Sequence, residues 1–472
     1  MRRTKIVCTL GPATSDAKTI EALVAAGMDV ARINMSHGVH DDHRERIRLV
    51  REAASATERP VAILVDLQGP KIRIGRLAEP VELVVDGIVT VAPEGSEKEG
   101  ELPSTYPDLA HDLEPGDQVL LDDGLLEMEC IEIDGDRARF RVIRGGSLSS
   151  HKGMNIPSGN LSAESLTGKD LRDLDFALEQ GVEFIGLSFV RSPRDVDALK
   201  ERIDGRALVV AKLEMARAMD SLAEILASAD MAMVARGDLG VELPFEQVPL
   251  AQKRIIQEAN FQVRPVITAT QMLESMIENP RPTRAEASDV ANAVLDGTDA
   301  VMLSGETAIG RYPLRATEAL VRIICEIEAS GVLERGPRYL QPRQHETRRG
   351  ATDREHAVAS ATVESVRHLS APAILTITRS GFSARLVSSH RPTVPIFAVT
   401  TDSQTFRELA AVWGVRPVLA RGVEISYESL TDFGKRAILE SGSGRAGDSI
   451  LVTAGFPFHQ PGTTNTMRVE HL

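Results

Sequence analysis

Eight short apolar runs alternate with helical patterns through the first two thirds of the chain. The runs are rich in Val, Ile, Leu or Ala, and they span residues 5–10, 30–35, 61–67, 183–189, 207–213, 231–235, 265–270 and 299–303. Continuous apolar runs suit parallel strands that are covered on both faces. Eight strands separated by helices favour a (β/α)8 TIM barrel over the alternative, an open doubly wound sheet. The predicted fold class is therefore α/β.

The alternation is interrupted between the third and fourth runs. Residues 71–163 carry short β-like runs and turn signals such as Asp134-Gly135, which predicts a hairpin. We expect a small all-β domain, a β-barrel, inserted into a βα loop of a barrel formed by residues 1–70 and 164–331. Such a loop emerges at the C-terminal face of a barrel, where these enzymes keep their active sites. The insertion is therefore expected to act as a lid.

The last third of the chain predicts a separate domain. Residues 334–353 are polar and read as a linker. Four further apolar runs follow with helical patterns between them, at residues 373–378, 395–399, 416–419 and 449–453. We expect a C-terminal α/β domain over residues 332–472.

Composition excludes several classes of protein. A net charge of −14 disfavours nucleic acid as a partner. The three cysteines are far apart, which excludes a disulfide scaffold and a cysteine-rich metal site. No apolar run is long enough for a membrane helix or a secretory signal. A cytoplasmic protein with no membrane or nucleic-acid partner is expected.

Polar side chains gather where six of the eight runs end, among them Arg32, Asp66, Lys212, Glu214 and Asp238. Any one of them could be a solvated charge at a strand end. The strand ends of a barrel, however, converge on one mouth. Carboxylates without His or Cys suit Mg²⁺ or Mn²⁺, and cations beside them suit a phosphorylated substrate. The pattern predicts a metal-dependent site for an anionic substrate.

Seven segments, in order along essentially the whole chain, resemble the pyruvate kinase family. They are TLGPATS (9–15), ARINMSHG (31–38), DLQGPKIR (66–73), KLE (212–214), MVARGDLG (233–240), ATQMLE (269–274) and MLSGETAIG (302–310). The resemblance implies transfer of a phosphoryl group from phosphoenolpyruvate to ADP, which gives ATP and pyruvate. It also implies a homotetramer.

The resemblance assigns catalytic roles to four residues. Lys212 would face the phosphoryl group in flight, and its point charge can neutralise the equatorial oxygens. Only ten of the 54 lysine and arginine residues are lysines, so a lysine at this position is informative. Arg32 and Arg73 would grip phosphate oxygens. Thr270 would lie near the enolate carbon and take part in proton delivery.

Metal and substrate positions follow from the same resemblance. Glu214 and Asp238 would hold Mg²⁺ or Mn²⁺. The backbone amides of Gly237 and Asp238 would bind the substrate carboxylate, and Thr270, Lys212 and Arg32 would complete the substrate site.

Lys71 bears on the requirement for a monovalent cation. Asn34, Ser36 and Asp66 match positions around the K⁺ site of the family. A Glu at position 71 goes with bound K⁺, whereas a Lys goes with no K⁺ requirement, because its ammonium group supplies the charge. The alternative is a surface lysine on the first residue of the lid. We expect activity without K⁺.

Nucleotide and effector positions are also implied. Positions on the ADP side include Pro12, His37 and Arg73, with Lys152, Asp122 and Asp123 in the lid. Ile309 stands where some family members have Lys, which leaves the nucleotide contacts less defined. In the last domain Thr378, Ser380 and Ser383 match a phosphorylated-effector site; the alternative is a helix N-cap cluster with no ligand.

Two other functions remain to be distinguished. One is another metal-dependent barrel enzyme of phosphoenolpyruvate or pyruvate, such as a mutase or lyase. The other is an inactive relative that only binds metabolites. The lid and the nucleotide-side residues argue against the first, and Lys212, Glu214, Asp238 and Thr270 argue against the second.

Overall fold

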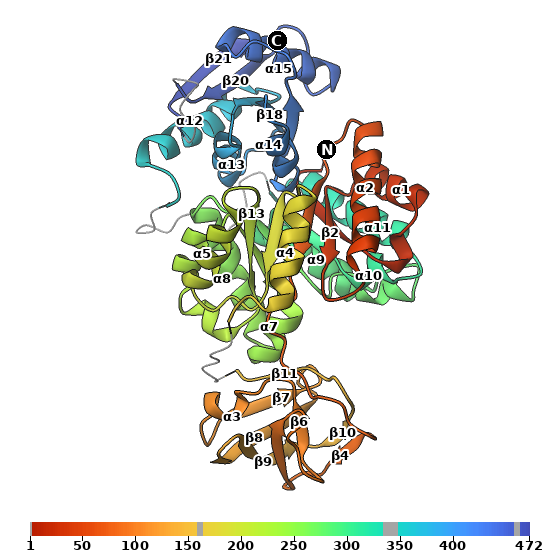
Figure 1. Cartoon of the computed structure of the whole chain (residues 1–472). Helices are drawn as coiled ribbons and strands as arrows, with labels where there is room; N and C mark the ends of the chain where they lie inside the picture. Colours follow the sequence, from red (N-terminus) through yellow and green to blue (C-terminus); the bar gives the residue numbers. More distant parts are fainter. Residues whose placement is uncertain (1, 158–163, 334–347, 457–462) are drawn as a thin grey trace.

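The N-terminal two thirds of the chain contain a closed barrel of eight parallel strands in the order β1-β16-β15-β14-β13-β12-β3-β2, which confirms the (β/α)8 prediction. The computed structural model describes residues 2–157, 164–333, 348–456 and 463–472 (Figure 1). The barrel strands are β1 (Lys5–Leu10), β2 (Val30–Asn34), β3 (Ala62–Asp66), β12 (Phe184–Leu187), β13 (Leu208–Leu213), β14 (Met231–Ala235), β15 (Val266–Ala269) and β16 (Ala300–Leu303). Each observed strand lies within one predicted apolar run.

Helices cover the outside of the barrel. The longer ones are α1 (Ala17–Ala26), α2 (His40–Ala56), α4 (Gly168–Glu179), α5 (Pro193–Ile203), α6 (Leu222–Ser228), α8 (Val248–Phe261), α9 (Arg284–Asp296) and α11 (Pro313–Ala329). Two short helices, α7 (Arg236–Glu242) and α10 (Gly305–Ala308), follow β14 and β16 directly. The start of α9 is a capping box: Glu286 N donates to Thr283 Oγ1 at 3.2 Å, and Thr283 N donates to Glu286 Oε2 at 2.7 Å.

The inserted segment forms a β domain beyond the end of β3 (Figure 1). Six strands make one sheet and two make another. The strands are β4 (Val81–Leu83), β5 (Ile88–Pro93), β6 (Leu102–Ser104), β7 (Gln118–Leu121), β8 (Leu126–Asp134), β9 (Arg137–Arg144), β10 (Gly146–Leu148) and β11 (Met154–Asn155), with the short helix α3 (Leu109–Asp112). The predicted hairpin joins β8 to β9 through Gly135, whose φ is 63°. Residues 158–163, which follow the inserted segment in the sequence, lie outside the described residues.

The C-terminal region is a five-stranded sheet in the order β19-β18-β17-β20-β21, with β21 antiparallel to β20. Its strands are β17 (Ile374–Ile377), β18 (Ile396–Thr400), β19 (Val415–Leu419), β20 (Ser449–Ala454) and β21 (Thr466–His471). Its helices are α12 (Asp353–Leu369), α13 (Phe382–Ser389), α14 (Ser403–Glu408) and α15 (Tyr427–Glu440), with a 3₁₀ turn η5 (Leu409–Ala411). Most of the predicted polar linker, residues 334–347, lies outside the described residues.

The C-terminal region closes one end of the barrel, opposite the β insertion (Figure 1). Ala410 and Ala411 of η5 join the apolar cluster inside the barrel. Beside them, Arg391 forms an ion pair with Asp299 at 2.9 Å, and both side chains are 5% exposed. Lys5 Nζ on β1 donates to the carbonyl of Val415 at 2.7 Å. No helix among the described residues has the length and apolar character to cross a membrane.

We predict that the Arg391–Asp299 pair holds the two regions together. Arg391→Met leaves the buried Asp299 carboxylate without its cation, and breaking such a pair costs about 3–5 kcal/mol. The control is Arg367→Met, since Arg367 pairs with Glu364 on the exposed face of α12 at 3.2 Å. That change costs at most about 1 kcal/mol. Thermal unfolding measures both, and equal midpoints for the two variants would contradict the prediction.

Candidate active site

Four charged side chains meet at the C-terminal ends of the barrel strands. Lys212 Nζ lies 2.8 Å from Glu214 Oε1 and 3.2 Å from Asp66 Oδ1. Arg32 Nη2 lies 2.6 Å from Asp66 Oδ2. Lys212 Nζ also donates to Ser188 Oγ at 2.6 Å. The structure therefore brings together side chains from β2, β3 and β13, in a cluster that we call the charged cluster: Arg32, Asp66, Lys212 and Glu214.

Ion pairing in the charged cluster favours the charged forms of Asp66 and Lys212. Burial raises the pKa of Asp66, but the charges of Lys212 and Arg32 outweigh burial and hold that pKa below its usual value. Burial lowers the pKa of Lys212, but Asp66 and Glu214 outweigh it and raise that pKa above its usual value. Lys212 is therefore a stable cation even though its side chain is only 11% exposed.

The carboxylates beside Lys212 fit a divalent cation. Burial raises the pKa of Glu214, and the nearby charge of Asp238 adds to this effect. Burial also raises the pKa of Glu242, at the end of α7, and Asp238 and Glu214 raise it further. A cation among these carboxylates would relieve their repulsion. Within the described residues, no group of three or more His, Cys, Asp or Glu side chains is placed to hold a metal ion.

Thr270 lies directly against the start of α7. The Gly237 amide donates to Thr270 Oγ1 at 2.7 Å, and the Thr270 hydroxyl donates to the Ala269 carbonyl at 2.7 Å. A Cβ on Gly237 would lie 3.4 Å from Thr270 Oγ1, which is ordinary van der Waals contact, so the two residues are direct neighbours. The amide of Gly237, expected to bind the substrate carboxylate, is occupied by Thr270 in this structure.

Cavities lie between the barrel mouth and the inserted β domain. The larger has a volume of about 680 Å³, and its lining includes Lys71, Asp123, Gly237 and Asp238. A smaller one shares Lys71, Asp123 and Asp238 and adds Glu242. Residues of the barrel and of the insertion therefore face the same space. Lys71, at their junction, lines both cavities.

Other predicted residues form their hydrogen bonds and ion pairs outside the charged cluster. Arg73 Nη1 donates to the His151 carbonyl at 2.8 Å, and Lys152 pairs with Asp122 at 2.8 Å, so both bond within the inserted region. Asn34 is the last residue of β2 and is paired with Asp66 in the strand register, and its Oδ1 accepts from Ser36 N at 3.1 Å. His37 follows β2, and its carbonyl contacts His43 Nε2 at 2.9 Å. Pro12 begins a 3₁₀ turn that follows β1. Their cation and nucleotide roles stay predictions.

Comparisons with known proteins identify the family. The model for the pyruvate kinase barrel domain matches residues 1–317, and the model for the pyruvate kinase alpha/beta domain matches residues 356–470. The chain belongs to the pyruvate kinase family. It is 46% identical to the pyruvate kinase of Mycobacterium intracellulare and 45% identical to that of Corynebacterium glutamicum, in each case over 100% of this chain and 98% of the relative.

A solved structure agrees with the sequence comparison. A pyruvate kinase from Cryptosporidium parvum superposes with a TM-score of 0.92 at 34% identity, covering 100% of this chain and 96% of the other. The homologues and this neighbour are pyruvate kinases, so the chain is an enzyme of the transferase class.

Several residues of the candidate active site of this pyruvate kinase family member were not predicted from the sequence. Thr9 Oγ1 accepts from Arg32 Nη1 at 3.0 Å, and Ser188 accepts from Lys212. Both lie at the ends of apolar runs, so the rule that found Arg32 could have found them. Asn155 of the inserted domain donates to Glu242 Oε1 at 3.1 Å, and no motif in the sequence indicated that this residue belongs to the site.

Two of the predicted effector residues, Thr378 and Ser380, lie in the loop before α13, and the third, Ser383, lies in its first turn. Thr378 and Ser383 are buried, and the Ser383 hydroxyl shares a hydrogen bond of 2.7 Å with Thr464 Oγ1. Gly381 caps α13 with a φ of 75°. The three hydroxyl residues named from the sequence, Thr378, Ser380 and Ser383, thus surround the start of one helix.

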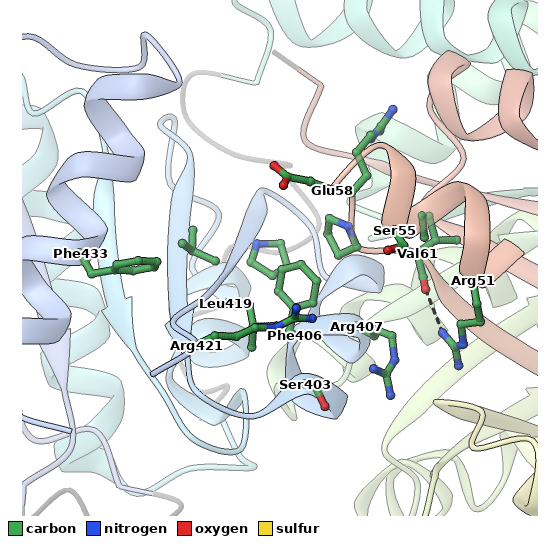
Figure 2. Close-up of a pocket in the computed structure, with 15 residues that line it drawn as sticks. Arg51, Ser55, Glu58, Val61, Ser403, Phe406, Arg407, Leu419, Arg421 and Phe433 are labelled. Carbon is green, nitrogen blue, oxygen red and sulfur yellow. Dashed lines mark hydrogen bonds between the residues drawn. The ribbon is translucent and has the colours of Figure 1, made fainter. Parts of the chain in front are cut away.

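A third cavity, about 660 Å³, lies where the barrel meets the C-terminal region (Figure 2). It is lined by four arginines: Arg51, Arg59, Arg407 and Arg421. Two of them pair with the fully buried Glu183, which lies 2.9 Å from Arg51 and also pairs with Arg407. This ionic link joins α2 of the barrel to α14 of the C-terminal region, and the sequence did not reveal it.

Proposed function

We propose that this member of the pyruvate kinase family transfers the phosphoryl group of phosphoenolpyruvate to ADP with the help of Mg²⁺ or Mn²⁺. The observation that carries the proposal is the charged cluster, in which the buried Lys212 ammonium group lies 2.8 Å from Glu214, a carboxylate that is itself near the charge of Asp238. A buried cation of this kind suits the negative charge of a phosphoryl group in transfer. A divalent ion held by Glu214 and Asp238 would withdraw charge from the phosphate oxygens.

Three cationic side chains would bind the phosphoryl group during its transfer. Lys212 and Arg32 bind the phosphoryl oxygens from the barrel, and Arg73 binds them from the inserted side. The bond from phosphorus to the enolate oxygen breaks, and a new bond forms from phosphorus to the terminal phosphate oxygen of ADP. This displacement yields ATP and the enolate of pyruvate.

Thr270 belongs to the second half of the reaction. The enolate becomes pyruvate when its terminal carbon gains a proton. Thr270, at the Gly237 amide, is the residue that we assign to that proton delivery. The insertion, which shares a cavity with the barrel mouth through Asp123, would act as the lid that excludes water.

A coupled assay tests the function directly. We expect ATP and pyruvate to form in equal amounts from phosphoenolpyruvate, ADP and Mg²⁺, and no reaction after the divalent ion is chelated. A mutase or lyase would consume phosphoenolpyruvate or pyruvate without forming ATP, and a binding-only relative would form neither product. Either of those results would overturn the proposal.

Lys212→Met should lower turnover by roughly 10²–10³, because it removes one preorganised charge that faces the transition state. The matched control is Lys200→Met, whose ammonium pairs with Asp230 at 2.8 Å away from the charged cluster. The coupled assay measures both variants, and the control should keep the parent rate. Near-normal turnover of Lys212→Met would remove Lys212 from the mechanism.

We also propose that the activity does not require K⁺. The support is the position of Lys71, which lines the same cavity as Asp238. The rate with Mg²⁺ should be nearly the same in K⁺-free and K⁺-containing buffer. Lys71→Glu should become K⁺-activated, because it removes the ammonium charge. A rise of about tenfold on adding K⁺ to the parent, roughly 1.4 kcal/mol of barrier, would refute this.

We also infer allosteric activation by a phosphorylated metabolite at Thr378, Ser380 and Ser383. Ser383→Asp places a negative charge in the first turn of α13 and should abolish activation by any sugar phosphate or nucleoside monophosphate that activates the parent. Ser441→Asp, on the exposed end of α15, serves as the control and should keep it. Full activation of Ser383→Asp would show that the assignment is wrong.

A homotetramer is the assembly that the family resemblance implies. Phe245 and Leu250, at the junction of α7 and α8, are 85% and 68% exposed in the single chain. Large exposed apolar side chains of this kind suit burial against another copy of the chain.

A further inference from the structure

The backbone around Thr270 is held in an unfavourable conformation. Thr270 has a φ of 65° and Gln271 a φ of 55°, directly after β15 ends at Ala269. A β-branched residue is a genuine outlier in this left-handed region. Such conformations persist where the surrounding structure enforces them, and they cluster at functional sites. The contacts that hold the 269–273 loop are therefore informative.

Arg236 holds this loop by its carbonyl groups. Its Nη2 donates to the Thr270 carbonyl at 2.7 Å and to the Gln271 carbonyl at 3.1 Å, and its Nε lies 3.3 Å from the Ala269 carbonyl. Its Nη1 is anchored by Asp289 of α9 at 2.7 Å. A guanidinium group is a rigid planar fork, so these donors fix the carbonyls relative to one another.

Glu306 holds the same loop by an amide group. Its Oε1 accepts from Leu273 N at 3.0 Å, and its Oε2 accepts from Ser304 N at 2.7 Å. The side chain belongs to α10 and is 2% exposed. A carboxylate accepts at both oxygens, whereas an amide side chain offers one acceptor and one donor. Glutamine therefore cannot reproduce both bonds.

We propose that Arg236 and Glu306 are positioning residues that hold the 269–273 loop from both sides and so place the Thr270 hydroxyl for proton delivery. The inference rests on the proposed function, which assigns that step to Thr270. Both residues act through the backbone of the loop, which is why neither needs to contact the substrate.

The Ala269 carbonyl links Arg236 to the chemistry of Thr270. It accepts the Thr270 hydroxyl hydrogen at 2.7 Å and also faces Arg236 Nε. The Thr270 oxygen meanwhile accepts from the Gly237 amide, one residue after Arg236. Loss of the Arg236 guanidinium group would release the Ala269 carbonyl and the 269–273 loop. The Thr270 hydroxyl would then lose its fixed orientation.

A double-mutant cycle tests the inference. Arg236→Lys and Glu306→Gln should each lower kcat by about tenfold or more, while KM for phosphoenolpyruvate changes by less than about threefold. When Thr270→Ala is already present, either change should lower turnover no further, because residues that act as one unit are not additive. Exchange of the pyruvate methyl hydrogens with D₂O, followed by NMR, should slow by the same factor as kcat.

The control is Arg264→Lys. Arg264 is half-buried, as Arg236 is, and it donates to the Leu226 and Ala227 carbonyls at 3.1 Å each, outside the 269–273 loop. It should leave kcat and the exchange rate unchanged. If Arg236→Lys does not fold, judged by its thermal midpoint, the Glu306→Gln cycle decides alone.

Three results separate the possible failures. Losses that multiply in the double variants would overturn the inference, as would a raised KM with normal kcat. An inactive parent would instead overturn the proposed function itself.

Discussion

The Lys212 ammonium group between Asp66 and Glu214 is the interaction on which the rest of the structure depends. Burying these ions is costly unless each one is paired, so the barrel must align them closely. β12 lies between β3 and β13, and Gly186 on β12 is opposite Asp66. A Cβ on Gly186 would lie 3.0 Å from Asp66 Oδ1, so a glycine there gives the carboxylate room to reach Lys212 across a strand.

The two ends of the barrel have different tasks. At the N-terminal end, η5 and the Arg391–Asp299 pair fill and seal the barrel with residues of the C-terminal region. At the C-terminal end, the β insertion faces the carboxylates across a cavity. A rigid base therefore supports a mouth whose charged groups are preorganised, and such preorganisation is what electrostatic catalysis requires.

Much of this arrangement could be predicted from the sequence because apolar periodicity determines buried parallel strands. The residues at the strand ends, such as Lys212 and Glu214, followed from the same pattern. The exact end of the seventh barrel strand could not be predicted, because apolar periodicity does not report backbone dihedral angles. The run 265–270 includes Thr270, yet β15 ends at Ala269 and Thr270 turns into a left-handed conformation. The edge strands β6 and β21 were missed for different reasons: β6 has only three residues, and β21 has no buried residue to give an apolar pattern.

Binding of a divalent cation tests the central claim most directly. Isothermal titration of Mn²⁺ into the protein with phosphoenolpyruvate present, and ADP absent, measures whether the buried carboxylates hold a metal. The account predicts saturable binding that Glu214→Gln weakens by about tenfold or more, because one ligand charge is lost at the site. Equal affinity of Mn²⁺ for the parent and for Glu214→Gln would contradict it.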